Sequence, residues 1–271
     1  MNRDMKAVFW QSLVSRKKSL VVYCLIAIGL MWMYVAFYPS IAAQADEFNK
    51  LFESYPESFT AVLGIEEISF TSLENFLALE QFSIMWPIIA IIMLMGIAGS
   101  AVAGEIEKGT IEQVLSRPIS RIDMFLGRYF AGFAAFTIFT ALSVFSVFPL
   151  AALHGLQVKP DHHISVFFMC MLFGSSILSL SFLASVLFSE KSKAYFLSGG
   201  ILGAMYVFSA IANLSDKIEF LKYGSFFYYA DLVNVLTKNE LPGFSIIIFL
   251  AFILISTAFA IAYFNKRDIA V

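Results

Sequence analysis

The segment Gly104–Arg128, GEIEKGTIEQVLSRPISRIDMFLGR, lies between two long apolar runs: Ile84–Ala103, IMWPIIAIIMLMGIAGSAVA, before it, and Tyr129–Leu153 after it. Runs of about 20 apolar residues have the length that spans a bilayer core. Backbone groups in lipid must be hydrogen-bonded within their own segment, so such runs predict helices. A simple turn between two spans needs only a few polar residues. The longer charged segment therefore predicts a docking element for a soluble partner.

The composition of the whole chain agrees with a membrane protein. Its 271 residues are 59% hydrophobic and 14% charged, with a mean hydropathy of +0.80, whereas a soluble domain carries about 25% charged residues. We predict an all-α integral membrane protein with a single transmembrane domain over residues 1–271. The third span is long enough to tilt or kink, and Pro149 lies near its far end. The six predicted spans are Leu20–Tyr38, Ile84–Ala103, Tyr129–Leu153, Ile164–Phe188, Ala194–Ala212 and Phe244–Phe264.

The distribution of Lys and Arg predicts the orientation. With the N-terminus inside, 13 of the 18 basic residues lie in inside segments and 5 lie outside. This bias predicts that both termini are cytoplasmic, in a multi-pass protein of the cell (plasma) membrane. Because those basic residues serve the topology, no patch large enough for nucleic acid remains.

The N-terminal stretch Asn2–Ser19 has apolar residues at helical spacing, namely Met5, Val8, Phe9 and Leu13, with basic residues between and after them. This pattern predicts a short amphipathic helix in the cytoplasmic interface that runs into the first span. The alternative is a basic flank that only sets the topology.

Two further helices are expected outside the spans. Ala42–Tyr55 has one apolar side, and Ser72–Gln81 forms a second helical stretch, both in the first outer segment. The aromatic cluster Phe226–Tyr229 suits the membrane interface. The alternative there is a re-entrant or half-spanning helix over Ser225–Leu236, in which Asp231 and Asn234 would need polar partners.

The three histidines cluster in one predicted outer loop. His154, His162 and His163 fall there, with Asp161 beside them. Imidazoles and a carboxylate can bind zinc or copper. However, two of the histidines are adjacent and no supporting ligand spacing is present, so ordinary loop residues are the favoured interpretation and no metal site is predicted.

The sequence contains no catalytic or nucleotide-binding motif. HExxH, GxSxG, CxxC and the GxxxxGK[ST] phosphate loop are all absent, so we expect neither an enzyme nor a cofactor in this chain. The predicted cores of the spans hold no Asp, Glu, Lys, Arg or His, which argues against an ion-coupled carrier. Small and hydroxyl-bearing residues in the second, fourth and fifth spans instead predict close helix packing.

The charged segment itself has helical features. Ile106, Thr110 and Val114 are helically spaced, Arg117–Pro118 breaks that helix, and Ser120 can cap the next one. One interpretation is a solvated hairpin. The length and mixed charge favour a helix that inserts into a groove of a partner.

Two motifs resemble a known family. The stretch E-x-E-K-G-T-I-E-x-x-L-S-x-P-I-S-R, Glu105–Arg121, resembles the cytoplasmic loop of ABC type-2 transporter permeases, the ABC-2 exporter class. The C-terminal Phe264–Ile269 is similar to the closing F-x-x-R-D of that family. Six spans, an acidic outer segment after the first span and a cytoplasmic loop after the second also fit.

The resemblance implies a permease subunit of an ATP-driven exporter that forms the translocation path. A separate ABC ATPase subunit would bind the ATP, and a second permease copy or a related permease would complete the transporter. Glu105–Arg121 would be the coupling helix, and Asn2–Ser19 the connecting helix. The alternative is a non-transporting membrane anchor or sensor of an ATPase complex. The residues expected to dock the ATPase are Glu105, Glu107, Lys108, Thr110, Glu112, Arg117 and Arg121.

Overall fold

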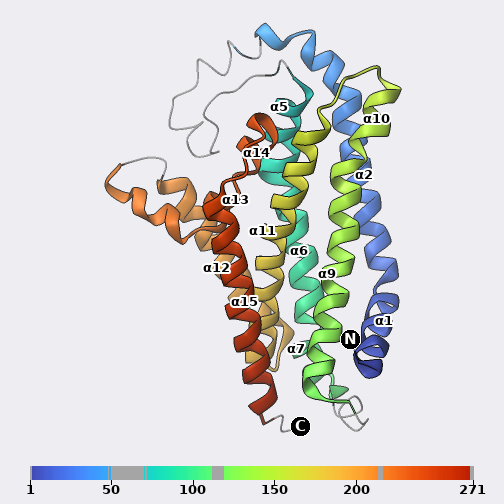
Figure 1. The fold of residues 1–271 in the computed structure, drawn as a ribbon, viewed down its shortest axis with the longest axis vertical. Coiled ribbons are helices and arrows are strands. Elements are labelled where there is room, and N and C mark those ends of the chain that lie inside the picture. Colours follow the sequence, from blue (N-terminus) through green and yellow to red (C-terminus); the bar gives the residue numbers. More distant parts are fainter. Residues whose placement is uncertain are drawn as a thin grey trace.

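Long helices run roughly along the longest axis of the molecule, and both chain ends lie at the same end of the bundle (Figure 1). In the part of the chain that the structure describes, six helices are long and apolar enough to cross a membrane, which confirms the predicted number of spans. The described part of the chain contains no β-strand. The computed structural model describes residues 2–47, 49, 70, 72–111, 119–212 and 216–268.

The predicted spans correspond to helices with somewhat different ends. A short helix, α1, precedes the first span, and shorter helices connect the later ones. The spans are α2 (Lys17–Ala42), α5 to α6 (Leu73–Gly99), α9 and α10 (Arg121–Leu153), α11 (Pro160–Leu187), α12 (Lys191–Ala212) and α15 (Gly243–Lys266). The shorter elements are α1 (Arg3–Ser15), α7 (Ala103–Glu107), η2 (Asp216–Gly224), α13 (Phe226–Ala230) and α14 (Leu232–Lys238).

The second span begins earlier than predicted. The stretch Ser72–Gln81, expected as a separate outer helix, is the first part of this span, and Ser72 caps it by accepting a hydrogen bond from the amide of Asn75. The span comprises α5 (Leu73–Leu77), a π-helical segment η1 (Ala78–Met85) and α6 (Trp86–Gly99). Pro87 lies just after the π-helical segment, in the first turn of α6. In a regular α-helix its ring would clash with the carbonyl group four residues earlier, and it has no amide hydrogen to donate.

The third span is interrupted near the proline, where the sequence predicted a tilt or kink. α9 (Arg121–Phe145) is followed by Ser146, and α10 (Val147–Leu153) continues the span. Pro149 lacks an amide hydrogen, and its ring crowds the carbonyl group of Phe145 four residues earlier. The interruption therefore follows directly from the proline.

The fourth span, α11, lies at the centre of the bundle. It packs against α6, α9, α12, α14 and α15, and 72% of its most apolar window is buried. A Cβ atom on Gly174 would lie 2.0 Å from the ring of Phe136, so only glycine allows α9 to approach this closely. Next to this contact, Trp86 is fully buried and stacks on Phe139 with ring centroids 6.3 Å apart. These contacts form the aromatic centre of the core.

The predicted half-spanning helix is divided. Ser225–Leu236 was expected to be continuous, but Asp231 has a φ of 35° and separates α13 from α14. Its carboxylate accepts hydrogen bonds from the backbone amide and the side-chain amide of Asn234. Asp is one of the few residues that tolerate this left-handed conformation, because its short side chain can bond the nearby backbone. Of the other outer helix, Ala42–Tyr55, the structure describes only residues 42–47 and 49, and the rest lies outside the described residues.

Candidate functional site

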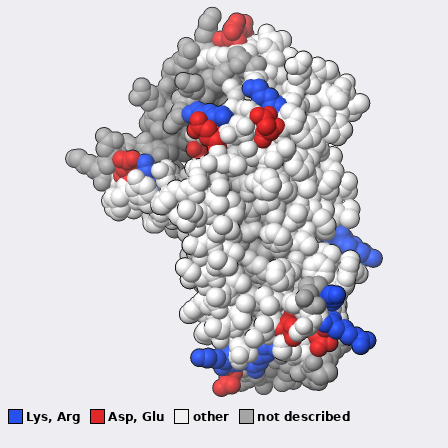
Figure 2. All heavy atoms as spheres, in the orientation of Figure 1, with Lys and Arg blue, Asp and Glu red and all other residues white. Residues whose placement is uncertain are grey.

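The predicted docking segment lies at the end of the bundle that carries both termini. Figure 1 shows α1, α7 and the start of α9 at this end. Figure 2 shows that charged side chains gather towards the two ends of the molecule, with a broad uncharged band between them. This distribution is typical of a protein whose middle lies in lipid.

Helix α1 forms one side of this end. It packs on α9 at Gly127, which has no side chain. A Cβ atom on Gly127 would lie 2.9 Å from the Cβ of Val8 and 3.0 Å from the carbonyl oxygen of Met5, so only glycine allows this close approach. Val8 is buried, while Met5, Phe9 and Leu13 are half-buried. The predicted helix is therefore confirmed, and its apolar side packs on the bundle itself.

The charged segment is not one continuous helix. The short α7 ends at Glu107, and Gly109 adopts a φ of 67°, a left-handed turn that favours glycine. The helical spacing from Ile106 to Thr110 therefore predicted a longer helix than the described residues form. Residues 112–118, which include the expected docking residues Glu112 and Arg117, lie outside the described residues.

Several expected docking residues also bind within the chain. The carboxylate of Glu105 accepts a 2.8 Å hydrogen bond from the Thr110 hydroxyl and lies 3.7 Å from Nη2 of Arg128. The carboxylate of Glu107 accepts a 2.9 Å hydrogen bond from the amide of Lys191, at the first turn of α12. A carboxylate is favourable there because of the unpaired amides at a helix N-terminus. Lys108 is exposed.

Arg121 connects the start of α9 to the C-terminal segment. Ser120 caps α9 by accepting a hydrogen bond from the amide of Asp123, as predicted. The Nη1 atom of Arg121 then donates to the carbonyl oxygens of Phe264, at 3.2 Å, and Arg267, at 2.5 Å. Both carbonyl groups lie at the C-terminal end of α15. The last carbonyl groups of a helix have no partner within the helix, so a cation is favourable there.

A polar cavity of about 390 Å³ lies between α1, α7 and α9, beside the contact of α1 with α9. Two arginines, Arg16 and Arg128, line it together with Glu105 and Ser100. Burial and the neighbouring positive charge of Arg128 lower the pKa of Arg16 from 12.5 to about 10. Arg16 therefore remains charged at neutral pH.

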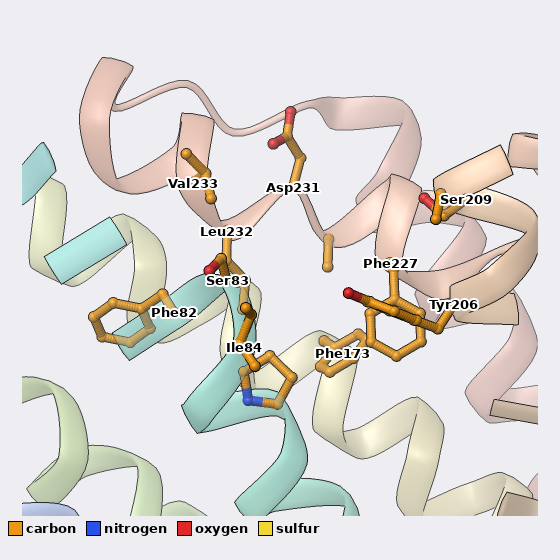
Figure 3. Close-up of a pocket in the computed structure, with 13 residues that line it drawn as sticks. Phe82, Ser83, Ile84, Phe173, Tyr206, Ser209, Phe227, Asp231, Leu232 and Val233 are labelled. Carbon is orange, nitrogen blue, oxygen red and sulfur yellow. The ribbon is translucent and has the colours of Figure 1, made fainter. Parts of the chain in front are cut away.

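A second cavity lies in the opposite half of the bundle (Figure 3). It is a small space of about 100 Å³ between the second span, α12 and the break between α13 and α14. The hydroxyl group of Tyr206 reaches towards its centre, beside Phe173 and Phe227. An apolar groove of about 340 Å³ adjoins it along α6 and α12, sharing Tyr206 and Phe227.

The sequence matches the family described as ABC-2 family transporter protein over residues 8–269, nearly the whole chain. The chain belongs to the ABC-2 transporter family. No curated protein matches it. The family match and the six apolar helices together make the chain a multi-pass membrane protein of an ABC transporter.

The described parts of both motifs that resemble ABC-2 permeases, residues 105–111 with 119–121 and residues 264–268, lie at the same end of this ABC-2 chain. Arg267, in the closing motif, donates hydrogen bonds to the carbonyl groups of Val186 and Phe188 and to the hydroxyl of Ser189. Val186 lies in the last turn of α11, and Phe188 and Ser189 follow the helix. The closing motif therefore attaches the last span to the central helix.

The outer histidines do not form the expected loop. Pro160 begins α11, so His162 and His163 are buried in its first turn, and His154 alone is exposed beyond α10. Nδ1 of His162 lies 2.7 Å from the carbonyl oxygen of Leu236. Among the described residues, no group of three or more His, Cys, Asp or Glu side chains could hold a metal.

Sequence reasoning did not single out the two arginines of the polar cavity. Arg128 was counted only as a topogenic charge, yet it lies on the face of α9 that carries Ala131, Gly132 and Ala135. A charged residue at helical spacing from small core residues indicates a buried side chain. Arg16 offered no such pattern, because it lies between two helices.

Proposed function

We propose that this chain is the membrane-spanning permease subunit of an ATP-driven ABC exporter. An ABC ATPase subunit binds and hydrolyses ATP on the cytoplasmic side, at the end that carries both termini. Its nucleotide-driven movements act on α1, α7 and the turn after α7. These movements switch a path through the membrane between inward and outward access, which requires that the ATPase bind the two states differently.

The observation that carries this proposal is the packing of α1 beside the charged segment. The contact through Gly127 and Val8 joins α1 to α9, and the hydrogen bond of Glu107 to Lys191 joins α7 to α12. A force applied to this end therefore reaches several spans through short contacts. Glu105, Glu107, Thr110 and Arg121 serve this internal coupling, while Lys108 is free to face the ATPase.

A second permease, either another copy or a related chain, completes the path on the side of α12. Only 17% of the most apolar window of α12 is buried within one chain. A Cβ atom on Gly200 or Gly203 would meet nothing within 4 Å. Small residues on an uncovered membrane helix allow close approach of a partner helix. The apolar groove between α6 and α12 would then lie beside the second permease.

The test is purification of the tagged full chain in mild detergent from its native host. We expect a stoichiometric ATPase with a phosphate-binding loop to purify with it. Lys108→Glu should reduce the amount of ATPase recovered, whereas Lys266→Glu, an exposed charge at the same end, should leave it unchanged. Recovery of the permease alone, under conditions that preserve comparable complexes, would refute the proposal.

Transport is tested separately from assembly. Reconstituted vesicles should show ATPase activity that rises when a transported compound is added, together with ATP-dependent movement of that compound. An intact complex whose ATPase activity responds to no compound, and which moves none, would favour the non-transporting anchor or sensor.

A further inference from the structure

The polar cavity beside α1 carries an excess of positive charge. Two arginines, Arg16 and Arg128, line it, and the exposed Lys108 borders it. Among the described lining residues Glu105 supplies the one carboxylate, which lies 3.7 Å from Nη2 of Arg128. One carboxylate cannot balance both arginines, so the described lining favours an anion.

One arginine is left with an unused donor. Nη2 of Arg16 donates to the hydroxyl of Ser100 at 3.3 Å, but its Nη1 atom is buried and has no hydrogen-bond partner in the described part of the chain. Burying an unpaired charged donor is costly. Arg128, in contrast, donates to the carbonyl oxygen of Ala101. An anion in the cavity would satisfy Arg16 without disturbing Arg128.

An apolar groove continues from this cavity into the span region. It has a volume of about 310 Å³ and shares Arg16 and Ser100 with the polar cavity. Beyond them it is lined by Leu20, Met93 and Ala135, among others. Met93 lies seven residues from Ser100 along the second span, which corresponds to about 10 Å of helix. The groove therefore extends along the second span, from the end that carries Arg16 and Lys191 towards Met93.

We propose that this pair of cavities is a binding site for an anionic phospholipid of the cytoplasmic leaflet. The headgroup phosphate lies between Arg16 and Arg128, and an acyl chain follows the groove along α2, α6 and α9. Arginine suits this role because its planar donors match phosphate oxygens. The bound lipid fills the space beneath α1 and so stabilises its position on α9. The assignment to the cytoplasmic leaflet rests on the proposed function, but the binding itself does not.

The test is native mass spectrometry of the delipidated full chain, titrated with phosphatidylglycerol, phosphatidylcholine or inorganic phosphate. We expect one phosphatidylglycerol molecule to bind more tightly than phosphatidylcholine. Arg16→Gln should weaken this binding about tenfold, since a hydrogen bond to a charged group is lost. The matched control Lys17→Gln removes the same charge from the next, exposed residue and should change the affinity less than twofold.

A second variant separates a lipid from a free phosphate. A Cβ atom on Gly96, which lines the apolar groove, would meet only the Tyr195 hydroxyl, at 3.9 Å. Gly96→Leu therefore adds apolar side-chain volume to the groove from a position whose Cβ atom has room. It should weaken phosphatidylglycerol binding and leave any effect of inorganic phosphate unchanged.

Four outcomes would overturn the proposal. Equal weakening by Arg16→Gln and Lys17→Gln would mean general surface attraction, and equal affinity for both lipids would remove the charge preference. Competition by inorganic phosphate, with no effect of Gly96→Leu, would mean a site for a small anion. Loss of the ATPase from Arg16→Gln with unchanged lipid binding would mean that the cavity receives an acidic side chain of that partner. Because binding is measured on the chain alone, failure to recover an ATPase bears only on the proposed function.

Discussion

The contact between α1 and α9 can be tested by adding a single methyl group. In Gly127→Ala, the new Cβ would lie 2.9 Å from two carbon atoms of Val8 and 3.0 Å from the carbonyl oxygen of Met5. The oxygen belongs to the backbone and cannot rotate away, so α1 itself must shift. Overpacking of this kind costs about 1 to 3 kcal/mol. The same substitution favours α9 as a helix by about 0.5 to 1 kcal/mol, so the cost falls on the docking of α1.

The consequence should be local. Val8 is the one side chain of α1 that is buried in the described structure, so α1 can detach while the bundle remains folded. A cost of 1 to 3 kcal/mol corresponds to roughly 5- to 150-fold more frequent opening. Hydrogen exchange followed by mass spectrometry should show faster exchange by that factor in α1 and unchanged exchange in α11.

The control is Gly29→Ala on α2, where an added Cβ would meet nothing within 4 Å. It should leave the exchange of α1 unchanged. Equal exchange of α1 in Gly127→Ala and the wild type would refute the packing argument. Faster exchange in every helix would show instead that α1 and the bundle unfold together.

Two further predictions concern the core and the uncovered side of α12. Trp86→Ala removes a fully buried ring that packs against other aromatic rings, and should lower the free energy of unfolding by about 3 to 5 kcal/mol. The control Trp32→Ala removes a side chain that is 57% exposed and should change that free energy by less than about 0.5 kcal/mol. Equal effects of the two variants in chemical denaturation would contradict the assigned core. Gly203→Cys should form a disulfide-linked dimer on mild oxidation, because both natural cysteines are buried and that position faces open space. Leu254→Cys, exposed on α15, is the control, and equal cross-linking of the two variants would argue against a partner on α12.

The number and order of the spans were predictable because apolar length is a local property. The start of the second span was not, since Glu74, Glu80 and Gln81 lower its hydropathy. Glu80 is exposed, whereas Glu74 and Gln81 are buried and have partners far away in the sequence. The carboxylate of Glu74 accepts a hydrogen bond from the amide of Lys159, and the side-chain amide of Gln81 donates to the hydroxyl of Ser143.

The site shows the same division. The Ser120 cap, the effect of Pro149 and the helix at the N-terminus followed from short-range rules, and each is confirmed. The sequence also predicted that Glu105 and Glu107 belong to a functional end, but not that they would bind Arg128 and Lys191 within the chain. The roles of these expected docking residues towards an ATPase remain predictions.

The sequence by itself determined that this chain has six segments long and apolar enough to cross a membrane, with a charged segment after the second, because helix length, hydropathy and capping depend on neighbouring residues. Only the tertiary structure decided which charges meet. Arg16 and Arg128 lie far apart in the chain, and they enclose one cavity because α1 folds back onto α9 at Gly127. Such a meeting depends on the packing of whole helices, which no local pattern encodes.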